Sequence, residues 1–197
     1  MLSDGYHDVP DGMLAMVVTH LEMKNRAATR DMSAPDGITL RRVSPTLDWY
    51  RDIFNRVGAQ EWLWFERLTY DDDKLAGIIL DQNVEIFTLS KDGQDEALLE
   101  LDFRTEGQCE LAYFGLTPKL IGSGAGRFLM NHAIETVWSR DITRFHVHTC
   151  TIDSPQALGF YIRSGFTPYR RQIEIAPDPR LTGMLGRDAG PAVPIIG

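Results

Sequence analysis

The spacing of apolar residues changes at Pro118, and this change narrows the folds that the chain can adopt. Before Pro118, three segments alternate apolar and polar residues and are joined by short glycine-containing turns, which is the pattern of antiparallel strands. After it, apolar residues recur three and four positions apart from Met130 to Trp138, which predicts a helix with one apolar face. Strands are expected at 84–90, 97–103, 109–117, 144–150 and 167–175, with a short helix ending at Gly165 between the last two. This order predicts an α+β (mixed α/β) fold and excludes a barrel or a helical bundle.

The first half of the chain predicts one further strand and two helical stretches. The strand is expected at 38–43. Ser44 followed by Pro45 is a favourable helix start, and Gly58 is a favourable stop. A second helical region is expected at 62–81, broken in its middle so that three aspartates lie at the positive N-terminus of its second part.

Local composition divides the chain into three stretches, and 197 residues fit one domain. Residues 1–36 form a polar leader with a candidate extra strand at 14–23, followed by a linker. Residues 37–175 carry the predicted domain. Residues 176–197 contain eight Gly or Pro, and we expect this tail to form no regular element. It is expected to be held against its own domain or against a second copy of the chain in a homodimer.

Composition argues against several classes of protein. The net charge is −8 and no stripe of Lys and Arg is present, which excludes a nucleic-acid partner. The longest apolar run, Met13 to Val18, is far shorter than the ~20 residues of a membrane span. The acidic N-terminal residues fit no signal peptide. Because Cys109 and Cys150 are too few for a disulfide framework, a reducing, cytoplasmic setting is expected.

A glycine-rich turn lies between the strand at 109–117 and the helix that follows. Gly122, Gly124 and Gly126 allow backbone N–H groups to converge on an anion at the positive end of that helix, which suits a phosphate. A Walker-type loop is excluded because no Lys-Ser or Lys-Thr pair follows the last glycine. A dinucleotide fingerprint fits badly because Arg127 occupies the place of a Gly or Ala. Taken alone, the turn is equally suited to be a tight packing corner.

Three segments of this region together form a recognisable series. They are Glu-Leu-Ala-Tyr-Phe-Gly-Leu at 110–116, Gly-Ser-Gly-Ala-Gly at 122–126, and Ser-Pro-Gln-Ala-Leu-Gly-Phe-Tyr at 154–161 with Gly-Phe at 165–166. The series resembles the GNAT superfamily of acetyl-CoA-dependent N-acetyltransferases in its fourth strand, its pyrophosphate loop and its Asn-x-x-Ala-x-x-x-Tyr…Gly-Phe block. Two positions depart from that pattern, with Ile121 in place of Gln or Arg and Ser154 in place of Asn. The resemblance implies a GNAT-like, mostly antiparallel sheet whose central fourth and fifth strands splay apart.

The resemblance also implies a set of residues that bind acetyl-CoA, with no metal. They are Phe114, Gly115 and Leu116 of the strand, Ile121, Gly122, Ser123, Gly124, Ala125, Gly126 and Arg127 of the turn, and Ser154. A glycine at 115, within an otherwise bulky strand, gives independent support because it suits a bulge or a close approach to the backbone. The alternative is a glycine that faces a large neighbouring side chain.

Moving an acetyl group from a thioester to an amine needs a base for the amine proton and an acid for the thiolate. By position, the resemblance implies Tyr161 as the acid, because a phenol with a pKa of about 10 is protonated at neutral pH. It implies Glu110 as the base, with a relayed water or His148 as second choices. The alternatives are that Tyr161 is a core tyrosine, that Glu110 is a solvated acid at the start of its strand, and that His148 lies on a packed face of the sheet. An acyl-carrying Cys150, or a metal held by His146, His148 and Cys150, is a weaker interpretation.

The acceptor is expected to be a small-molecule or peptide amine. Trp62 and Trp64 lie in the early helical region, which in the family walls the acceptor pocket, and they are equally suited to a core. The runs at 61–66 and 148–151 are similar to an uncharacterised bacterial branch of the superfamily. The sequence therefore predicts an acetyl-CoA-dependent N-acetyltransferase that works by direct attack in a ternary complex. The alternative is a non-catalytic acyl-CoA-binding sensor or interaction domain on the same fold.

Overall fold

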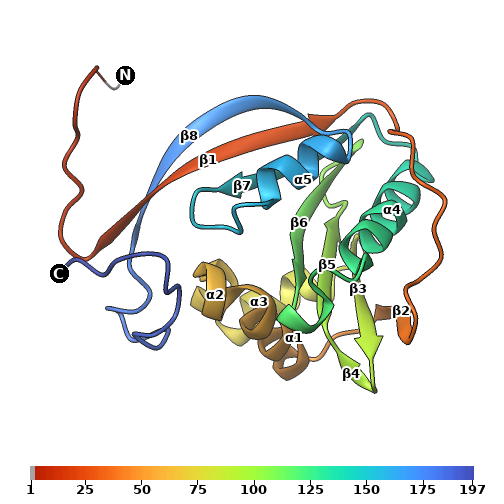
Figure 1. Ribbon diagram of the computed structural model, residues 1–197, viewed down its shortest axis with the longest axis horizontal. Coiled ribbons are helices and arrows are strands. Elements are labelled where there is room, and N and C mark those ends of the chain that lie inside the picture. Colours follow the sequence, from red (N-terminus) through yellow and green to blue (C-terminus); the bar gives the residue numbers. More distant parts are fainter. Residues whose placement is uncertain (1–2) are drawn as a thin grey trace.

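One sheet of eight strands organises the chain, and the computed structural model describes residues 3–197 (Figure 1). Seven strands follow the path β2-β3-β5-β6-β7-β1-β8, and β4 pairs only with β3. Every neighbouring pair is antiparallel except β6 with β7. The strands are β1 (Met13–Met23), β2 (Ile38–Val43), β3 (Val84–Lys91), β4 (Gln94–Asp95), β5 (Ala97–Asp102), β6 (Gln108–Leu116), β7 (Arg144–Cys150) and β8 (Thr167–Pro177). The predicted α+β, mostly antiparallel fold is confirmed.

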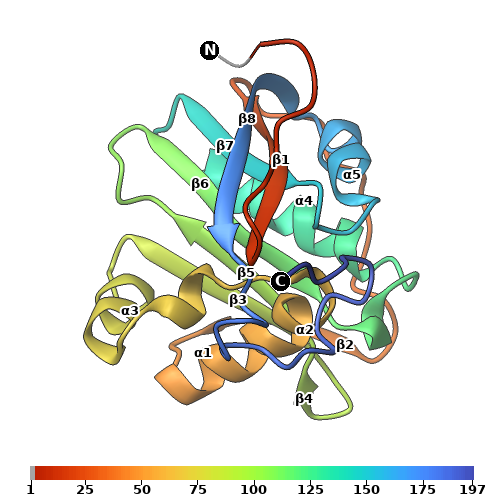
Figure 2. The same ribbon diagram turned by 90° about the vertical axis from the view of Figure 1, so that its left-hand side faces the viewer.

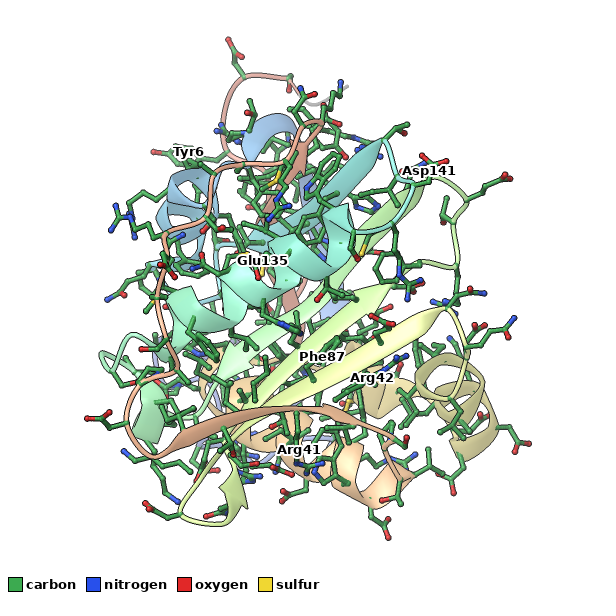
Figure 3. The ribbon with its side chains drawn as sticks, turned by 90° about the vertical axis from the view of Figure 1, so that its right-hand side faces the viewer. Tyr6, Arg41, Arg42, Phe87, Glu135 and Asp141 are labelled. Carbon is green, nitrogen blue, oxygen red and sulfur yellow. The ribbon has the colours of Figure 1, made fainter. Side chains whose placement is uncertain are left out.

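Helices cover both faces of the sheet. They are α1 (Leu47–Phe54), α2 (Gln60–Trp62), α3 (Asp72–Ile79), α4 (Ala125–Trp138) and α5 (Ala157–Arg163), with a π-helical turn at Asn55–Ala59 and 3₁₀ turns at Glu66–Thr69 and Pro118–Leu120. Helix α4 packs over the face that carries Phe87, and Glu135 lies on its outer side (Figure 3). Within residues 3–197 no helix has the length and apolar character needed to cross a bilayer.

Strand β5 lies between two apolar clusters, so all of its residues are buried. Leu99 and Leu101 pack in the cluster that contains α4 and α5. Leu98 packs in the opposite cluster with Phe54 of α1 and Leu75 of α3. Burial on both faces explains why this strand is so rich in leucine.

The parallel strands β6 and β7 pair over only three residues and then diverge. Their register runs from Gln108 opposite Arg144 to Glu110 opposite His146, although β6 continues to Leu116. A bulge in β6 follows immediately at Ala112, because the register against β5 shifts by one residue there. A bulge increases local twist and bends a strand, which separates β6 from β7 beyond this point. The predicted splay of the central strands is therefore confirmed, and it opens the sheet where the site lies.

The expected extra strand near the N-terminus exists as β1, and it lies inside the sheet. It pairs with β7 on one side and with β8 on the other, both antiparallel. With β8 it forms a long curved ribbon that arches over the open part of the sheet (Figure 1). Residues 24–36 then return along α4, where the Asn131 side-chain amide donates to the Arg30 carbonyl at 2.6 Å (Figure 3).

Two predicted helix boundaries near residue 50 are wrong. Helix α1 is capped by Thr46, whose hydroxyl accepts from the Trp49 amide at 3.2 Å, rather than by Ser44 with Pro45 as the first helical residue. The helical path also passes through Gly58 and ends at Leu63, which has a left-handed φ of 53°. The helical break and the acidic first turn of α3 are confirmed, with Asp71 as the N-cap.

The C-terminal tail has no regular element after Pro177 and packs on its own domain (Figure 2). The guanidinium of Arg180 organises it, because it pairs with Asp178 and donates to the carbonyls of Ala189, Gly190, Val193 and Pro194. Leu185 and Ala189 enter the same apolar cluster as Leu63 and Leu98. The tail thereby supports the segment that follows α2.

Candidate active site

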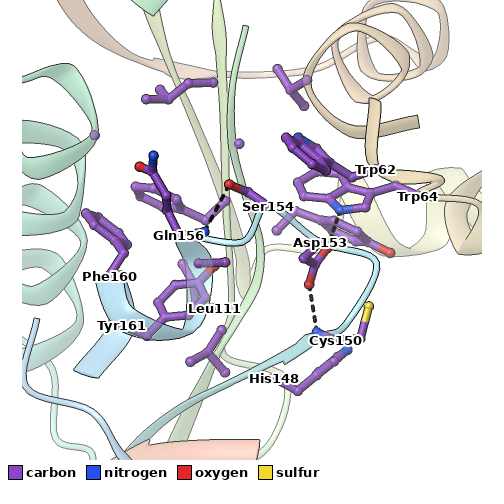
Figure 4. A pocket seen from close by; sticks show the side chains of 18 of the residues that line it. Trp62, Trp64, Leu111, His148, Cys150, Asp153, Ser154, Gln156, Phe160 and Tyr161 are labelled. Atoms are coloured by element: carbon purple, nitrogen blue, oxygen red, sulfur yellow. Dashed lines mark hydrogen bonds between the residues drawn. The ribbon is translucent and has the colours of Figure 1, made fainter. Parts of the chain in front are cut away.

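A cavity of about 540 Å³ lies where β6 and β7 diverge. Trp62 and Trp64 line one side, Phe160 and Tyr161 of α5 line the other, and Asp153 and Ser154 lie between them (Figure 4). The predicted residues Phe114, Gly115, Leu116, Ile121, Gly122, Gly124, Gly126, Arg127 and His148 also line it. Ser123 and Ala125 belong to the turn but do not line the cavity. The structure thus brings most of the residues of the sequence-predicted site together in one cavity.

The glycine turn presents unused hydrogen-bond donors at the start of α4. Gly122 and Gly124 have left-handed φ values of 82° and 88°, and Gly124 is the N-cap of the helix. In residues 3–197, the backbone N–H groups of Gly122, Gly124, Gly126 and Arg127 have no hydrogen-bond acceptor. Free N–H groups at a helix N-terminus form a favourable site for an anion such as a pyrophosphate. The turn therefore fits the phosphate group that the sequence implied.

Cationic side chains occur at the same end of the cavity. Arg127 donates to the Ser164 hydroxyl at 3.0 Å and lies over the Phe160 ring at 5.2 Å. Arg163 also lines the cavity. Burial lowers the pKa of Arg127, and the nearby charges of Arg30 and Arg163 lower it further, so an anion placed here would relieve both effects.

Tyr161 is 7% exposed and packs between Phe160 and Phe166, yet it lines the cavity. Its hydroxyl makes no hydrogen bond to any residue from 3 to 197. Burial raises the pKa of this phenol, and the charge of Asp153 raises it further. The side chain therefore keeps its proton at neutral pH, which a general acid requires.

Trp64 forms the most firmly held part of the opposite wall. Its indole N–H donates to Asp153 Oδ1 at 2.9 Å, and Asp153 Oδ2 accepts from the Thr149 hydroxyl and the Cys150 amide (Figure 4). Its ring also contacts Phe54 and Tyr113. Asp153, which follows β7, thus holds both the end of that strand and the Trp64 side chain.

Two glycines make room for this tryptophan. A Cβ built on Gly58 would lie 2.0 Å from Trp64 Cδ2, and one on Gly115 would lie 2.9 Å from Trp64 Cη2. Gly58 is therefore a packing residue and not the predicted helix stop. Gly115 faces large neighbours, Trp64 and Val57, and the bulge of β6 lies at Ala112 instead.

This packing makes a testable difference between two helical glycines. Gly58→Ala is expected to destabilise the fold by at least about 2 kcal/mol, because the added methyl group overlaps the Trp64 ring. Gly77→Ala in α3 is the matched control, since its Cβ would meet nothing within 4 Å, and it is expected to stabilise by about 0.5–1 kcal/mol. Thermal or urea unfolding measures both. Equal stabilities of the two variants would show that Trp64 is not held on Gly58.

His148 and Glu110 lie together, but only His148 faces the large cavity. Nδ1 of His148 is 3.6 Å from Glu110 Oε1, and this carboxylate raises the pKa of His148. Glu110 lines a separate polar cavity of about 270 Å³ with His146. On the other side, His20 of β1 stands opposite His148 with its ring 5.7 Å away. The arrangement places Glu110 behind His148 as seen from the cavity.

Cys150 and metal binding are poorly supported by the geometry. Burial raises the pKa of the Cys150 thiol to about 12, which disfavours the thiolate needed for an acyl-carrying nucleophile. Between residues 3 and 197, no three His, Cys, Asp or Glu side chains are arranged to hold a metal ion.

Sequence reasoning missed several cavity residues. Asp153, Glu66, Tyr113 and Glu174 line the cavity, and none was singled out. Asp153, three residues after the strand at 144–150, was a readable signal, because Asp before Ser-Pro is typical of a turn that caps neighbouring backbone. Glu66 and Glu174 gave no local signal, since folding alone brings them to the cavity.

The sequence model described as "Acetyltransferase (GNAT) family" matches residues 35–166, which include the glycine turn and the Tyr161 block. The chain belongs to this family. The family is one of acetyltransferases, which are acyltransferase enzymes that use acetyl-CoA.

Relatives of this GNAT chain are distant. A mycothiol acetyltransferase from Jonesia denitrificans is 25% identical over 188 residues, which cover 91% of this chain and 58% of that protein. Among solved structures, a GCN5-related N-acetyltransferase from Sphaerobacter thermophilus has a TM-score of 0.60 at 14% identity, covering 87% of this chain and 53% of that one. A tandem GNAT protein from the clavulanic acid biosynthesis pathway has a TM-score of 0.62 at 14% identity, covering 86% and 54%. The chain thus spans little more than half the length of these proteins, and the structural likenesses show the fold alone.

Proposed function

We propose that this chain transfers the acetyl group of acetyl-CoA to a primary amine by direct attack in a ternary complex. The observation that carries the proposal is the meeting of free backbone N–H groups and an unpartnered tyrosine hydroxyl in one cavity. The N–H groups suit a phosphate, and the hydroxyl suits a departing thiolate. Acetyl-CoA supplies the activated acyl carbon. The chain's own residues bind the two substrates and transfer the protons.

The cofactor end of the cavity runs from the glycine turn to the splayed strand. The free N–H groups of Gly122, Gly124, Gly126 and Arg127 hold the pyrophosphate, and Ser154 also lines the cavity. Beyond Glu110, β6 no longer pairs with β7, so the backbone of Phe114 to Leu116 is free on that side to hold the pantetheine arm and the oxyanion. Tyr161 then donates its proton to the sulfur.

His148 is the residue that the geometry supports best as the base. It faces the cavity, whereas Glu110 contacts it from behind at 3.6 Å. The other charged groups around it are Asp153 and Glu66, which raise its pKa, while burial lowers it. In this arrangement Glu110 is a positioning residue that holds the ring and its proton, and His148 takes the amine proton.

This division of roles predicts a pH shift. The acidic limb of kcat/KM follows His148, because only its neutral form accepts a proton. Removing the Glu110 charge destabilises the protonated ring and lowers the pKa of His148. Glu110→Gln is therefore expected to move the limb to lower pH by about one unit. A pH series of thiol release from acetyl-CoA measures it.

His148→Gln serves as the companion variant and is expected to lose about a hundredfold in kcat/KM. If Glu110→Gln instead loses that factor at every pH while His148→Gln stays active, Glu110 is itself the base. A merely structural Glu110 would leave the limb where it is.

The competing function is a non-catalytic acyl-CoA sensor on the same fold. A sensor needs the glycine turn but neither Tyr161 nor an aromatic acceptor wall, and this chain has both. Thiol release measured over a library of amines separates the two functions, because a sensor binds acetyl-CoA and turns over none of them.

Cys109 and Cys150 are both unpaired, which supports a reducing, cytoplasmic setting.

A further inference from the structure

Charged side chains are divided between the two ends of the large cavity. Its cations, Arg127 and Arg163, lie at the glycine-turn end. Its carboxylates are Glu66, Asp153 and Glu174. Asp153 holds Trp64, and Glu66 follows α2 directly after the aromatic run 62–65. The acceptor end therefore carries three carboxylates and no Lys or Arg.

Glu174 reaches this end from the arching ribbon. It stands opposite Met16 in the register of β1 and β8, so the two side chains share a face of the sheet. Met16 belongs to the apolar cluster that contains Trp64 and Phe65. Glu174 and Glu66 thus approach the acceptor end from two elements far apart in the sequence.

None of these three carboxylates forms an ion pair with any residue from 3 to 197. Glu66 and Glu174 are exposed and Asp153 is half-buried. Other carboxylates of the fold do form ion pairs, since Glu100 pairs with Arg67 and Glu96 with Lys119. Glu66 accepts only from the hydroxyls of Tyr70 and Tyr113, and Asp153 only from neutral donors. Their negative charges are left for whatever occupies the cavity.

The walls between these acids favour a cation as well. Trp62, Trp64, Phe65 and Tyr113 line the cavity. The faces of such rings attract ammonium groups, and most strongly where water is displaced. The cavity, its aromatic lining and its unpaired carboxylates are three separate features that all favour binding of a cationic amine.

We infer that the acceptor is a small amine with at least one positive charge besides the reacting nitrogen, such as a diamine, a polyamine or an amino sugar. This inference rests on the proposed function and names its substrate class. An amine that bears a carboxylate is disfavoured, because the acceptor end offers it no Lys or Arg and opposes it with unpaired acids.

Three probes of equal chain length test the inference: putrescine, butylamine and γ-aminobutyrate. Each has an amine on three methylene groups, and they differ in the far end, which is an aminomethyl, a methyl or a carboxylate group. Thiol release from acetyl-CoA at low salt is expected to give kcat/KM in that order, with about tenfold between neighbours. Added salt should narrow the gap between putrescine and butylamine, since exposed charges are screened. Equal or faster turnover of γ-aminobutyrate would overturn the inference.

Substitutions of the cavity carboxylates test whether they cause the preference for putrescine. Glu66→Gln and Glu174→Gln are each expected to raise KM for putrescine about three- to fivefold, with no such rise in KM for butylamine. Glu61→Gln is the matched control, because Glu61 is exposed like Glu66 and Glu174 but does not line the cavity. If Glu61→Gln has the same effect as the other two, the preference comes from net charge and the inference fails.

Calorimetry separates this inference from the proposed function. Putrescine is titrated into the chain saturated with CoA, so no turnover is needed. Binding that weakens in Glu66→Gln supports the acceptor class even if no amine is acetylated, in which case only the proposed function fails. Turnover of amines without any putrescine preference leaves the function standing and overturns the inference.

Discussion

Tyr161→Phe is expected to lower kcat by about a hundredfold or more and to leave the affinity for acetyl-CoA unchanged. The substitution removes only the hydroxyl, which makes no hydrogen bond to any residue from 3 to 197 and lines the cavity. The ring keeps its contacts with Phe160 and Phe166, so the fold is retained. What is lost is the proton for the leaving thiolate. Steady-state kinetics with a turned-over amine measure the effect.

Tyr113→Phe is the control for this result. Tyr113 lines the same cavity, but its hydroxyl donates to Glu66 at 3.1 Å and lies on the acceptor side. We expect a change in kcat of less than about tenfold for this variant, with any loss in the KM of the amine. An unchanged kcat in Tyr161→Phe would make Tyr161 a core tyrosine without a role in proton transfer.

Gly124→Glu is expected to abolish acetyl-CoA binding, with at least a hundredfold loss in affinity. Gly124 has a φ of 88°, which a residue with a side chain adopts only with strain. A Cβ there would lie 3.8 Å from Met32 Cε, so the new carboxylate adds a negative charge beside the free N–H groups that start α4 and repels a phosphate. Calorimetric titration with acetyl-CoA measures the loss.

Gly183→Glu separates the charge at the site from the backbone strain. Gly183 has a similar φ of 79°, and a Cβ there would meet nothing within 4 Å. It lies in the tail, away from the glycine turn, so this variant should bind acetyl-CoA normally. Retained binding in Gly124→Glu would mean that the turn is only a packing corner.

The parts of the structure that could be predicted are those set by neighbouring residues. The alternating strands, the apolar stripe of α4 and the left-handed glycines at 122 and 124 are local properties. The extra strand at 14–23 was also visible locally. Its place between β7 and β8 was not, because pairing of distant strands depends on tertiary packing that the sequence pattern does not express.

The errors have the same physical origin. Gly58 was expected to end a helix, but it is a glycine because Trp64 packs directly on it. The base is a separate case: Glu110 stays a prediction, and its contact across the fold with His148, which lines the cavity, is what favours His148. In each case a contact across the fold, and not the local residue type, decides the role. The acids at the acceptor end were missed for the same reason.

Titrating acetyl-CoA into the unmodified chain is the most direct test of the central claim that the splayed strands and the glycine turn form an acetyl-CoA site. We predict saturable binding of one molecule per chain with a dissociation constant in the micromolar range, typical of enzyme substrates. The absence of heat at any concentration, confirmed by a second binding method, would contradict the site assignment. The roles proposed for Tyr161 and His148 would then fall with it.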